Sequence, residues 1–133
     1  MADVNHYTGI HVNQNYTILI ADRNPRVREL LKRELSSEGY CIQLAKNARE
    51  VIEQVFSHET LNLLIIDLDL PDMEGLSLMD ALGDRIPTLP VIILTFHNNC
   101  EESSDLWPKK IIVEKDGNSV EQLKKIIHKM ANN

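Results

Sequence analysis

Three carboxylates follow one apolar stretch of this chain. The segment LNLLII, residues 61–66, runs directly into Asp67, and Asp69 and Asp72 follow within five residues. Carboxylates are costly to remove from water, so an acid that ends a buried strand normally has a partner or a task. The spacing therefore predicts that a positively charged group lies among these three acids.

Polar residues also end the other apolar stretches of the chain. TILIA is followed by Asp22, VIIL by Thr95, and KIIVE by Lys115. The carboxyl ends of parallel strands meet at one edge of a sheet, which is where such folds place their functional groups. We therefore expect six residues at one rim: Asp22, Arg23, Asp67, Asp69, Thr95 and Lys115.

Two acids, a hydroxyl and an ammonium at one sheet edge support phosphoryl transfer to a carboxylate. An aspartate nucleophile needs its charge offset, because the incoming phosphoryl group is itself anionic. Mg²⁺ bound by carboxylates would supply that offset, while a lysine and a hydroxyl would hold the phosphoryl oxygens. The acids around Asp67 are thus expected to hold a metal and to accept a phosphoryl group.

Five short apolar segments alternate with segments of helical periodicity. The expected strands are residues 17–21, 41–45, 62–67, a strand ending at Thr95, and 110–114, each followed by a helical pattern or a polar segment. Such alternation predicts an α/β fold with a parallel sheet and helices on both faces.

Local signals predict how some helices begin. Asn47 is expected to cap the second helix, and Ser119 with Gln122 predicts a capping box at the start of the last helix. The segment 97–110 has few apolar residues, and Pro108 excludes an intact helix across it. A helix there is expected to be short, frayed or partly replaced by loop.

Length and composition bound the class of protein. The 133 residues fit one domain: residues 1–16 are polar and are expected to form a flexible arm, and residues 17–133 the domain. A formal charge of −6 argues against direct nucleic-acid binding, and no apolar run approaches a membrane span. Two cysteines without metal-ligand spacing, and no secretory signal, favour a cytoplasmic protein.

Four segments together resemble the receiver domains of bacterial two-component response regulators. They are ILIADRNPRVRELL, LIIDLDLPDMEG, VIILT and EKDGNSVEQLKKI, and the resemblance covers about residues 16–131. It implies a doubly wound, five-stranded parallel sheet of the flavodoxin-like kind, with strand order 2-1-3-4-5.

The resemblance also implies a role for each site residue. Asp67 would be the phosphoacceptor, Thr95 would bind a phosphoryl oxygen, and Lys115 would pair with the acceptor or its phosphate. Asp22, Asp67 and the backbone carbonyl of Asp69 would bind Mg²⁺. The implied donor is a sensor histidine kinase or a phosphotransfer protein, and the implied output is binding of an unknown downstream protein or a homodimer. Such a domain is not an enzyme, apart from catalysing its own phosphorylation and dephosphorylation.

Three positions depart from the family's pattern. Arg23 stands where a second acid is usual, and an arginine cannot ligate Mg²⁺, so we expect weak metal binding. Its guanidinium is expected to pair with Asp67 or Asp69 instead. Phe96 replaces a small residue after the hydroxyl, and Ile112 replaces the aromatic residue that reports phosphorylation.

These departures leave other functions open. A pseudo-receiver would keep the fold and act as a binding module without phosphorylation, although retention of Asp67, Thr95 and Lys115 favours phosphorylation. The DLD motif is also similar to the nucleophile motif of haloacid-dehalogenase-type phosphatases, but that family has it on the first strand and has Thr or Val where Pro71 stands. A calcium-binding EF-hand loop fails, because Asp72 occupies its glycine position.

Overall fold

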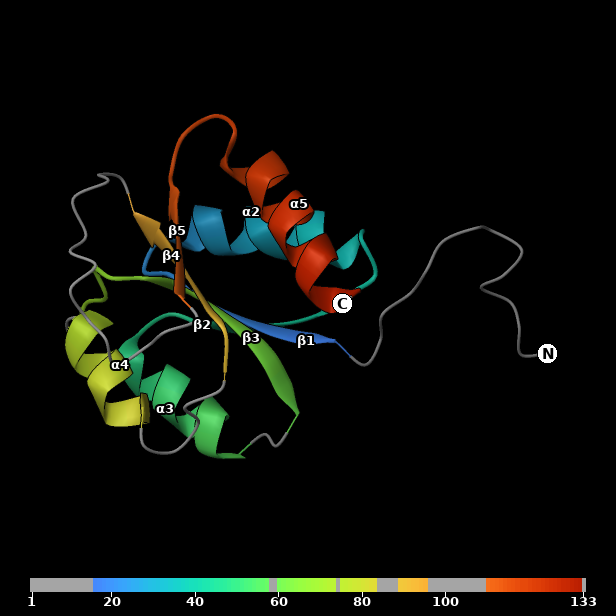
Figure 1. Ribbon diagram of the computed structural model, residues 1–133. Coiled ribbons are helices and arrows are strands. Elements are labelled where there is room, and N and C mark those ends of the chain that lie inside the picture. The colour runs from blue at the N-terminus through green and yellow to red at the C-terminus, as the bar shows by residue number, and fades with distance from the viewer. Residues whose placement is uncertain (1–15, 58–59, 74, 84–88, 96–109, 133) are drawn as a thin grey trace.

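The computed structural model describes residues 16–57, 60–73, 75–83, 89–95 and 110–132 (Figure 1). The described strands are β1 (Thr17–Ala21), β2 (Cys41–Ala45), β3 (Leu61–Asp67), β4 (Val91–Thr95) and β5 (Lys110–Glu114). The described helices are α2 (Pro25–Ser36), α3 (Ala48–Ser57), α4 (Gly75–Gly83) and α5 (Ser119–Ala131). Strands and helices thus alternate from β1 to β4 as the sequence predicts, and β5 is followed by α5.

All five strands join one parallel sheet. Its order is β2-β1-β3-β4-β5, and each neighbouring pair is parallel. The predicted doubly wound fold is therefore confirmed. The chain passes from β1 outward to β2 on one side, then returns to β3 on the other side of β1. The carboxyl ends of β1 and β3 consequently flank the point where the strand order reverses, which is the usual ligand site of such sheets.

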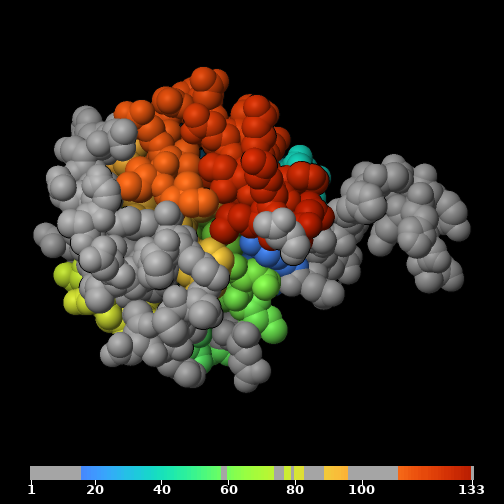
Figure 2. Space-filling view, in the orientation of Figure 1, coloured from blue at the N-terminus to red at the C-terminus, as the bar shows by residue number. Residues whose placement is uncertain are grey.

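Helices cover both faces of the sheet. In Figure 1, α3 and α4 lie on one face and α2 and α5 on the other. In the space-filling view of Figure 2, β5 and α5 form a continuous surface. Side chains of β1 alternate between two cores: Leu19 packs with the α3 and α4 side, and Ile18 and Ile20 with the α2 and α5 side. The central strands β1, β3 and β4 are therefore buried and largely apolar, whereas the edge strand β2 is only partly buried and carries the polar Gln43.

The start of α2 follows its local sequence signals. Asn24 Oδ1 accepts a hydrogen bond from Arg26 N at 2.9 Å, and Pro25 is the first helical residue. Beyond the helix, Gly39 has a φ of 99°, a conformation that glycine adopts without strain. These signals bracket the first helix and fix where the chain leaves β1.

The two predicted caps have different outcomes. Asn47 Oδ1 accepts from Glu50 N at 2.9 Å, so the cap of α3 is confirmed. The capping box of α5 is wrong, because Ser119 is already helical and its hydroxyl donates to the Asp116 carbonyl at 3.1 Å. The Asp116 carboxylate accepts from Asn118 N at 2.8 Å, so an Asp116 turn, and not a serine cap, precedes the helix.

Some predictions fall on residues outside the described ranges. These are the broken helix within 97–109, the side chain of Phe96, and the arm up to residue 15. Tyr16 is described: its carbonyl accepts from Cys41 N at 3.0 Å, and its ring lies 5.6 Å from that of Tyr40. The boundary of the arm remains a prediction.

Candidate functional site

The predicted site residues sit on four different strands. Asp22 directly follows β1, Asp67 ends β3, Thr95 ends β4, and Lys115 directly follows β5. The register of the sheet aligns these ends, since Asp67 pairs with Leu94, and Thr95 pairs with Glu114. The buried apolar strands therefore hold the polar groups at one edge.

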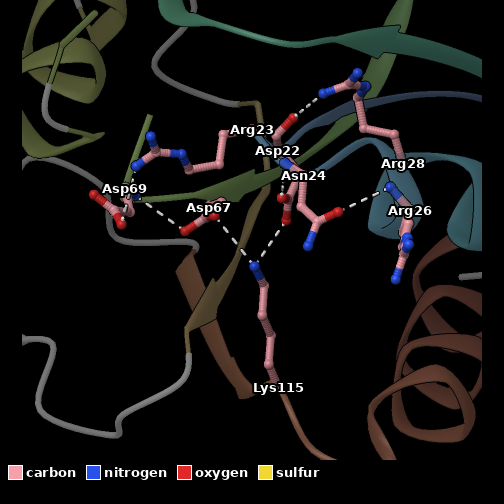
Figure 3. Close-up of polar contacts among 8 residues, drawn as sticks. All are labelled: Asp22, Arg23, Asn24, Arg26, Arg28, Asp67, Asp69 and Lys115. Atoms are coloured by element: carbon pink, nitrogen blue, oxygen red, sulfur yellow. Dashed lines mark hydrogen bonds and ion pairs between the residues drawn. The ribbon is translucent and has the colours of Figure 1, made fainter. Parts of the chain in front are cut away.

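Lys115 lies between two carboxylates. Its Nζ is 2.8 Å from Asp22 Oδ2 and 3.1 Å from Asp67 Oδ2 (Figure 3). The Asp22 side chain is 1% exposed, and the side chains of Asp67 and Lys115 are each 10% exposed. Lys115 N also donates to the Thr95 carbonyl at 2.6 Å, which fixes the lysine to β4. We call Asp22, Asp67 and Lys115 the inner cluster.

The inner cluster keeps its lysine charged. Burial lowers the pKa of the Lys115 ammonium, but its contacts with Asp22 and Asp67 outweigh burial, and the net effect raises that pKa above its ordinary value. Lys115 is thus a cation at neutral pH. It is a positive group beside Asp67, the first of the three acids among which the sequence predicts a cation.

The second oxygen of each inner carboxylate accepts a hydrogen bond from a backbone N–H two residues further along the chain. Asp22 Oδ1 accepts from Asn24 N at 2.9 Å, and Asp67 Oδ1 accepts from Asp69 N at 3.0 Å. Arg28 Nη1 donates to the Asp22 carbonyl at 2.7 Å and holds the same loop from α2. Both carboxylates are therefore positioned by backbone groups as well as by the lysine.

Arg23 pairs with Asp69 at the edge of the site. Arg23 Nη1 lies 3.5 Å from Asp69 Oδ2, and the two side chains are 52% and 82% exposed. Figure 3 shows Arg23 extending from the end of β1 toward Asp69, on the same side of the site as Asp67. Of the two partners the sequence left open, the structure has Asp69. We call Arg23 and Asp69 the outer pair.

The residues fit a magnesium ion only in part. Among the described residues, no three acidic, histidine or cysteine side chains are arranged as a ready metal site. Asp22 Oδ2, however, is a buried carboxylate oxygen, and it is ion-paired with Lys115 Nζ at 2.8 Å. Mg²⁺ in proteins commonly keeps several waters and one or two carboxylates. Asp22 and Asp67 supply that number of acids, so the donor set fits the ion, and weak binding stays a prediction.

Asp72 does not belong to the site. Its carboxylate accepts from Ala48 N at 2.8 Å and Arg49 N at 3.0 Å, at the start of α3. The bond from Ala48 is the main reason that the pKa of Asp72 is lowered. The expectation that all three acids surround one cation is therefore wrong for Asp72. Its partners lie about two dozen residues away, so no local pattern could have shown this role.

The remaining predicted site residues, Thr95, Ile112 and Phe96, lie outside the inner cluster and the outer pair. Thr95 is half-buried at the end of β4, and its carbonyl is engaged by Lys115 N. Ile112 is half-buried on β5 and packs against the core on the α3 and α4 side. Phe96 lies outside the described ranges. Arg28 was not predicted, because a contact with a strand-end carbonyl has no signature in the sequence.

Comparison with known proteins identifies the family. A family model described as the response regulator receiver domain matches residues 18–109. The chain belongs to this family of receiver domains, which are signalling domains of two-component response regulators. The match ends before Lys115, so the structure, and not the family match, brings that lysine to the site.

Two relatives illustrate the similarity. The chain is 32% identical over 94 residues to the DNA-binding transcriptional regulator NtrC of Proteus hauseri, covering 71% of this chain and 20% of NtrC. It thus spans about a fifth of that relative's length. The response regulator TrrA of Thermotoga maritima, in complex with Mg²⁺–BeF, is 31% identical with a TM-score of 0.77, covering 86% of this chain and 98% of TrrA.

A second structure of TrrA includes a histidine kinase. TrrA in complex with the kinase ThkA is 30% identical to this chain, with a TM-score of 0.72, covering 86% of this chain and 97% of TrrA.

In the described part of the present chain, no helix combines the length and apolarity needed to cross a bilayer.

Proposed function

We propose that this receiver domain accepts a phosphoryl group on Asp67 and signals by binding another protein. The observation that carries the proposal is the inner cluster, in which Lys115 Nζ contacts both Asp22 and Asp67 at the switch point of the sheet. A buried acid with a fixed cation beside it is suited to receive an anionic group.

The proposed reaction is a single phosphoryl transfer. A carboxylate oxygen of Asp67 attacks phosphorus and forms an O–P bond, while the P–N bond of a phosphohistidine donor breaks. The electron pair of that bond stays on the ring nitrogen, and the imidazole leaves neutral because its other nitrogen carries the proton. The product is an acyl phosphate on Asp67.

The chain's own residues prepare this step. Asp69 N holds Asp67 Oδ1, and Lys115 faces Asp67 Oδ2, so the carboxylate is oriented before the donor arrives. After transfer, Lys115 and the Thr95 hydroxyl would hold phosphoryl oxygens. The carboxylates of Asp22 and Asp67 and the backbone carbonyl of Asp69 would hold Mg²⁺, which supplies charge offset when bound. The Mg²⁺–BeF complex of TrrA supports the use of Mg²⁺ by this site.

The donor and the output follow from the family. The ThkA complex of TrrA supports a sensor histidine kinase as donor, or a phosphotransfer protein that carries the same phosphohistidine. A downstream protein or a homodimer would read the phosphorylated state, and the setting would be the cytoplasm. Because the relatives are longer than this chain, any activity of their other parts lies beyond the proposal.

One observation favours a second function, a pseudo-receiver that binds partners without phosphorylation. The outer pair already neutralises Asp69 with a guanidinium, where the family usually offers another acid. In such a domain the charge of the site would stay the same, because Asp67 would never be phosphorylated. It differs from the first proposal in one testable property, namely whether Asp67 takes up a phosphoryl group.

The test is an intact-mass measurement after incubation with Mg²⁺ and acetyl phosphate or phosphoramidate. We expect one added phosphoryl group on the wild type, none on Asp67→Asn, and one on the matched control Asp72→Asn, which changes a nearby acid outside the site. Absence of the adduct from the wild type at saturating Mg²⁺ would refute phosphoacceptance and support the pseudo-receiver.

A further inference from the structure

We propose that Arg23 is a phosphoryl-binding residue, whose guanidinium leaves Asp69 and binds oxygens of the phosphoryl group on Asp67. This inference rests on the proposed function and adds a residue to its site. Its consequence is that phosphorylation of this chain depends less on Mg²⁺ than phosphorylation of a site with a second acid at position 23 would.

The first argument is the position of the guanidinium. Arg23 directly follows Asp22, so its backbone is fixed at the end of β1 beside the inner cluster. Its Nη1 contacts Asp69 Oδ2, and Asp69 N is bonded to Asp67 Oδ1 at 3.0 Å. The charged group of Arg23 therefore contacts the residue whose backbone N–H holds the acceptor carboxylate, as Figure 3 shows.

The second argument is that the outer pair is easily exchanged. Its distance is 3.5 Å and its side chains are 52% and 82% exposed, so water screens the attraction. A phosphoryl group carries up to two negative charges and three acceptor oxygens, which match the planar fork of a guanidinium. Arg23 would thus gain a stronger partner within reach when Asp67 is phosphorylated.

The third argument is the charge of the site. Three carboxylates, those of Asp22, Asp67 and Asp69, face two cations, Lys115 and Arg23, which leaves one formal negative charge. An acid at position 23 would instead leave three, with four carboxylates facing one lysine. An incoming phosphoryl anion is repelled less by the site as it stands, so a divalent cation has less charge to offset.

The neighbouring arginines are not equivalent to Arg23. Arg28 is held by the carbonyl of Asp22 at 2.7 Å, and in Figure 3 Arg26 projects from α2 on the side of Asn24 away from Asp67. Arg26 is exposed and lies in the same loop and helix start. It therefore provides a matched control that removes the same charge without touching the acceptor.

The experiment measures phosphoryl uptake from phosphoramidate by intact mass, in saturating Mg²⁺ and in EDTA. In uptake, the P–N bond breaks and ammonia leaves with the electron pair. We expect the wild type and Arg26→Ala to retain measurable uptake in EDTA, and Arg23→Ala to lose that uptake by about tenfold or more. Arg23→Asp should need Mg²⁺ for uptake.

A second readout follows the side chain itself. The Nε–H signal of Arg23 in a ¹⁵N-labelled protein, assigned with Arg23→Lys, should shift when the phosphoryl group is added, while that of Arg26 should not. If EDTA lowers phosphoryl uptake equally in the wild type and Arg23→Ala, and the Arg23 Nε–H signal does not shift on phosphorylation, the inference is overturned and phosphoacceptance stands. Absence of uptake by the wild type even in Mg²⁺ would overturn both.

Discussion

The inner cluster and the outer pair adjoin each other yet differ in how firmly the fold holds them. The side chains of Asp22, Asp67 and Lys115 are at most 10% exposed, with contacts of 2.8 and 3.1 Å, whereas the outer pair is mostly exposed and 3.5 Å apart. A buried charge without its partner is costly, but water replaces a lost exposed partner. Arg23, which stands where the resemblance predicts a second acid, belongs to the exposed outer pair, where loss of a partner costs little.

The largest effect on stability is expected for Lys115→Met. It leaves the buried carboxylates of Asp22 and Asp67 facing each other without a cation, which should lower the free energy of unfolding by about 3 kcal/mol. Urea unfolding at neutral pH measures the change. The control is Lys125→Met on the exposed side of α5, which should change stability little. Equal effects of the two substitutions would show that the inner cluster is not specially sensitive.

The stabilisation by Lys115 should disappear at high pH. Its folded-state pKa is raised above the ordinary value of 10.5, so the stabilisation is complete below that value and is lost as pH rises through the folded-state pKa. The stability difference between the wild type and Lys115→Met should therefore be constant from pH 8 to about 10 and shrink above it. A difference that already shrinks between pH 8 and 9 would contradict the raised pKa.

Asp72 separates the effect of burial from that of hydrogen bonding. It is exposed like the outer pair, but its carboxylate binds two backbone N–H groups at the start of α3. Asp72→Asn should lower the melting temperature less than Lys115→Met and more than loss of the outer pair. Because its pKa is lowered, this stabilisation is present above the ordinary value of 3.8 and is lost as pH falls through the folded-state pKa.

Thermal unfolding from pH 7 downward measures that difference. The control is Glu53→Gln, which removes an exposed pair with Arg49 in α3 and leaves the backbone bonds of Asp72 in place. A control that destabilises as much as Asp72→Asn would show that general helix electrostatics, and not the bonds to Ala48 and Arg49, stabilise this helix.

The smallest effect is expected for the outer pair. Arg23→Ala should change the free energy of unfolding by less than about 1 kcal/mol, because both side chains are exposed and the pair is long. A double-mutant cycle with Asp69→Ala measures the coupling directly. If the coupling energy between Arg23 and Asp69 were as large as that measured in the same way between Asp22 and Lys115, the inner cluster and the outer pair would not differ in how firmly the fold holds them.

Much of the fold was readable from the sequence because each strand is an apolar run ended by a polar residue. The bounds of β1 and β2 agree with TILIA and CIQLA, and β3 begins one residue earlier than expected, at Leu61. The start of α5 was misjudged because Asp116 organises the turn before the helix. Its carboxylate accepts from Asn118 N and its carbonyl accepts from the Ser119 hydroxyl, so Ser119 lies inside the helix and does not cap it.

The site was predictable to the extent that strand ends converge. That rule places Asp22, Asp67 and Lys115 together, and the structure has them in contact. The partner of Arg23 stayed open because both Asp67 and Asp69 were within reach. In the structure Arg23 pairs with Asp69, while the oxygens of Asp67 accept from Lys115 Nζ and from Asp69 N.

The central claim is that Asp67, and no other acid of the site, becomes phosphorylated. Borohydride reduces an aspartyl phosphate to homoserine, so protein treated with phosphoramidate and Mg²⁺ can be reduced, digested and sequenced by mass spectrometry. We predict homoserine at position 67 alone, with aspartate unchanged at Asp22 and Asp69. Homoserine at either of those positions, or unmodified Asp67 in every peptide, would contradict the claim.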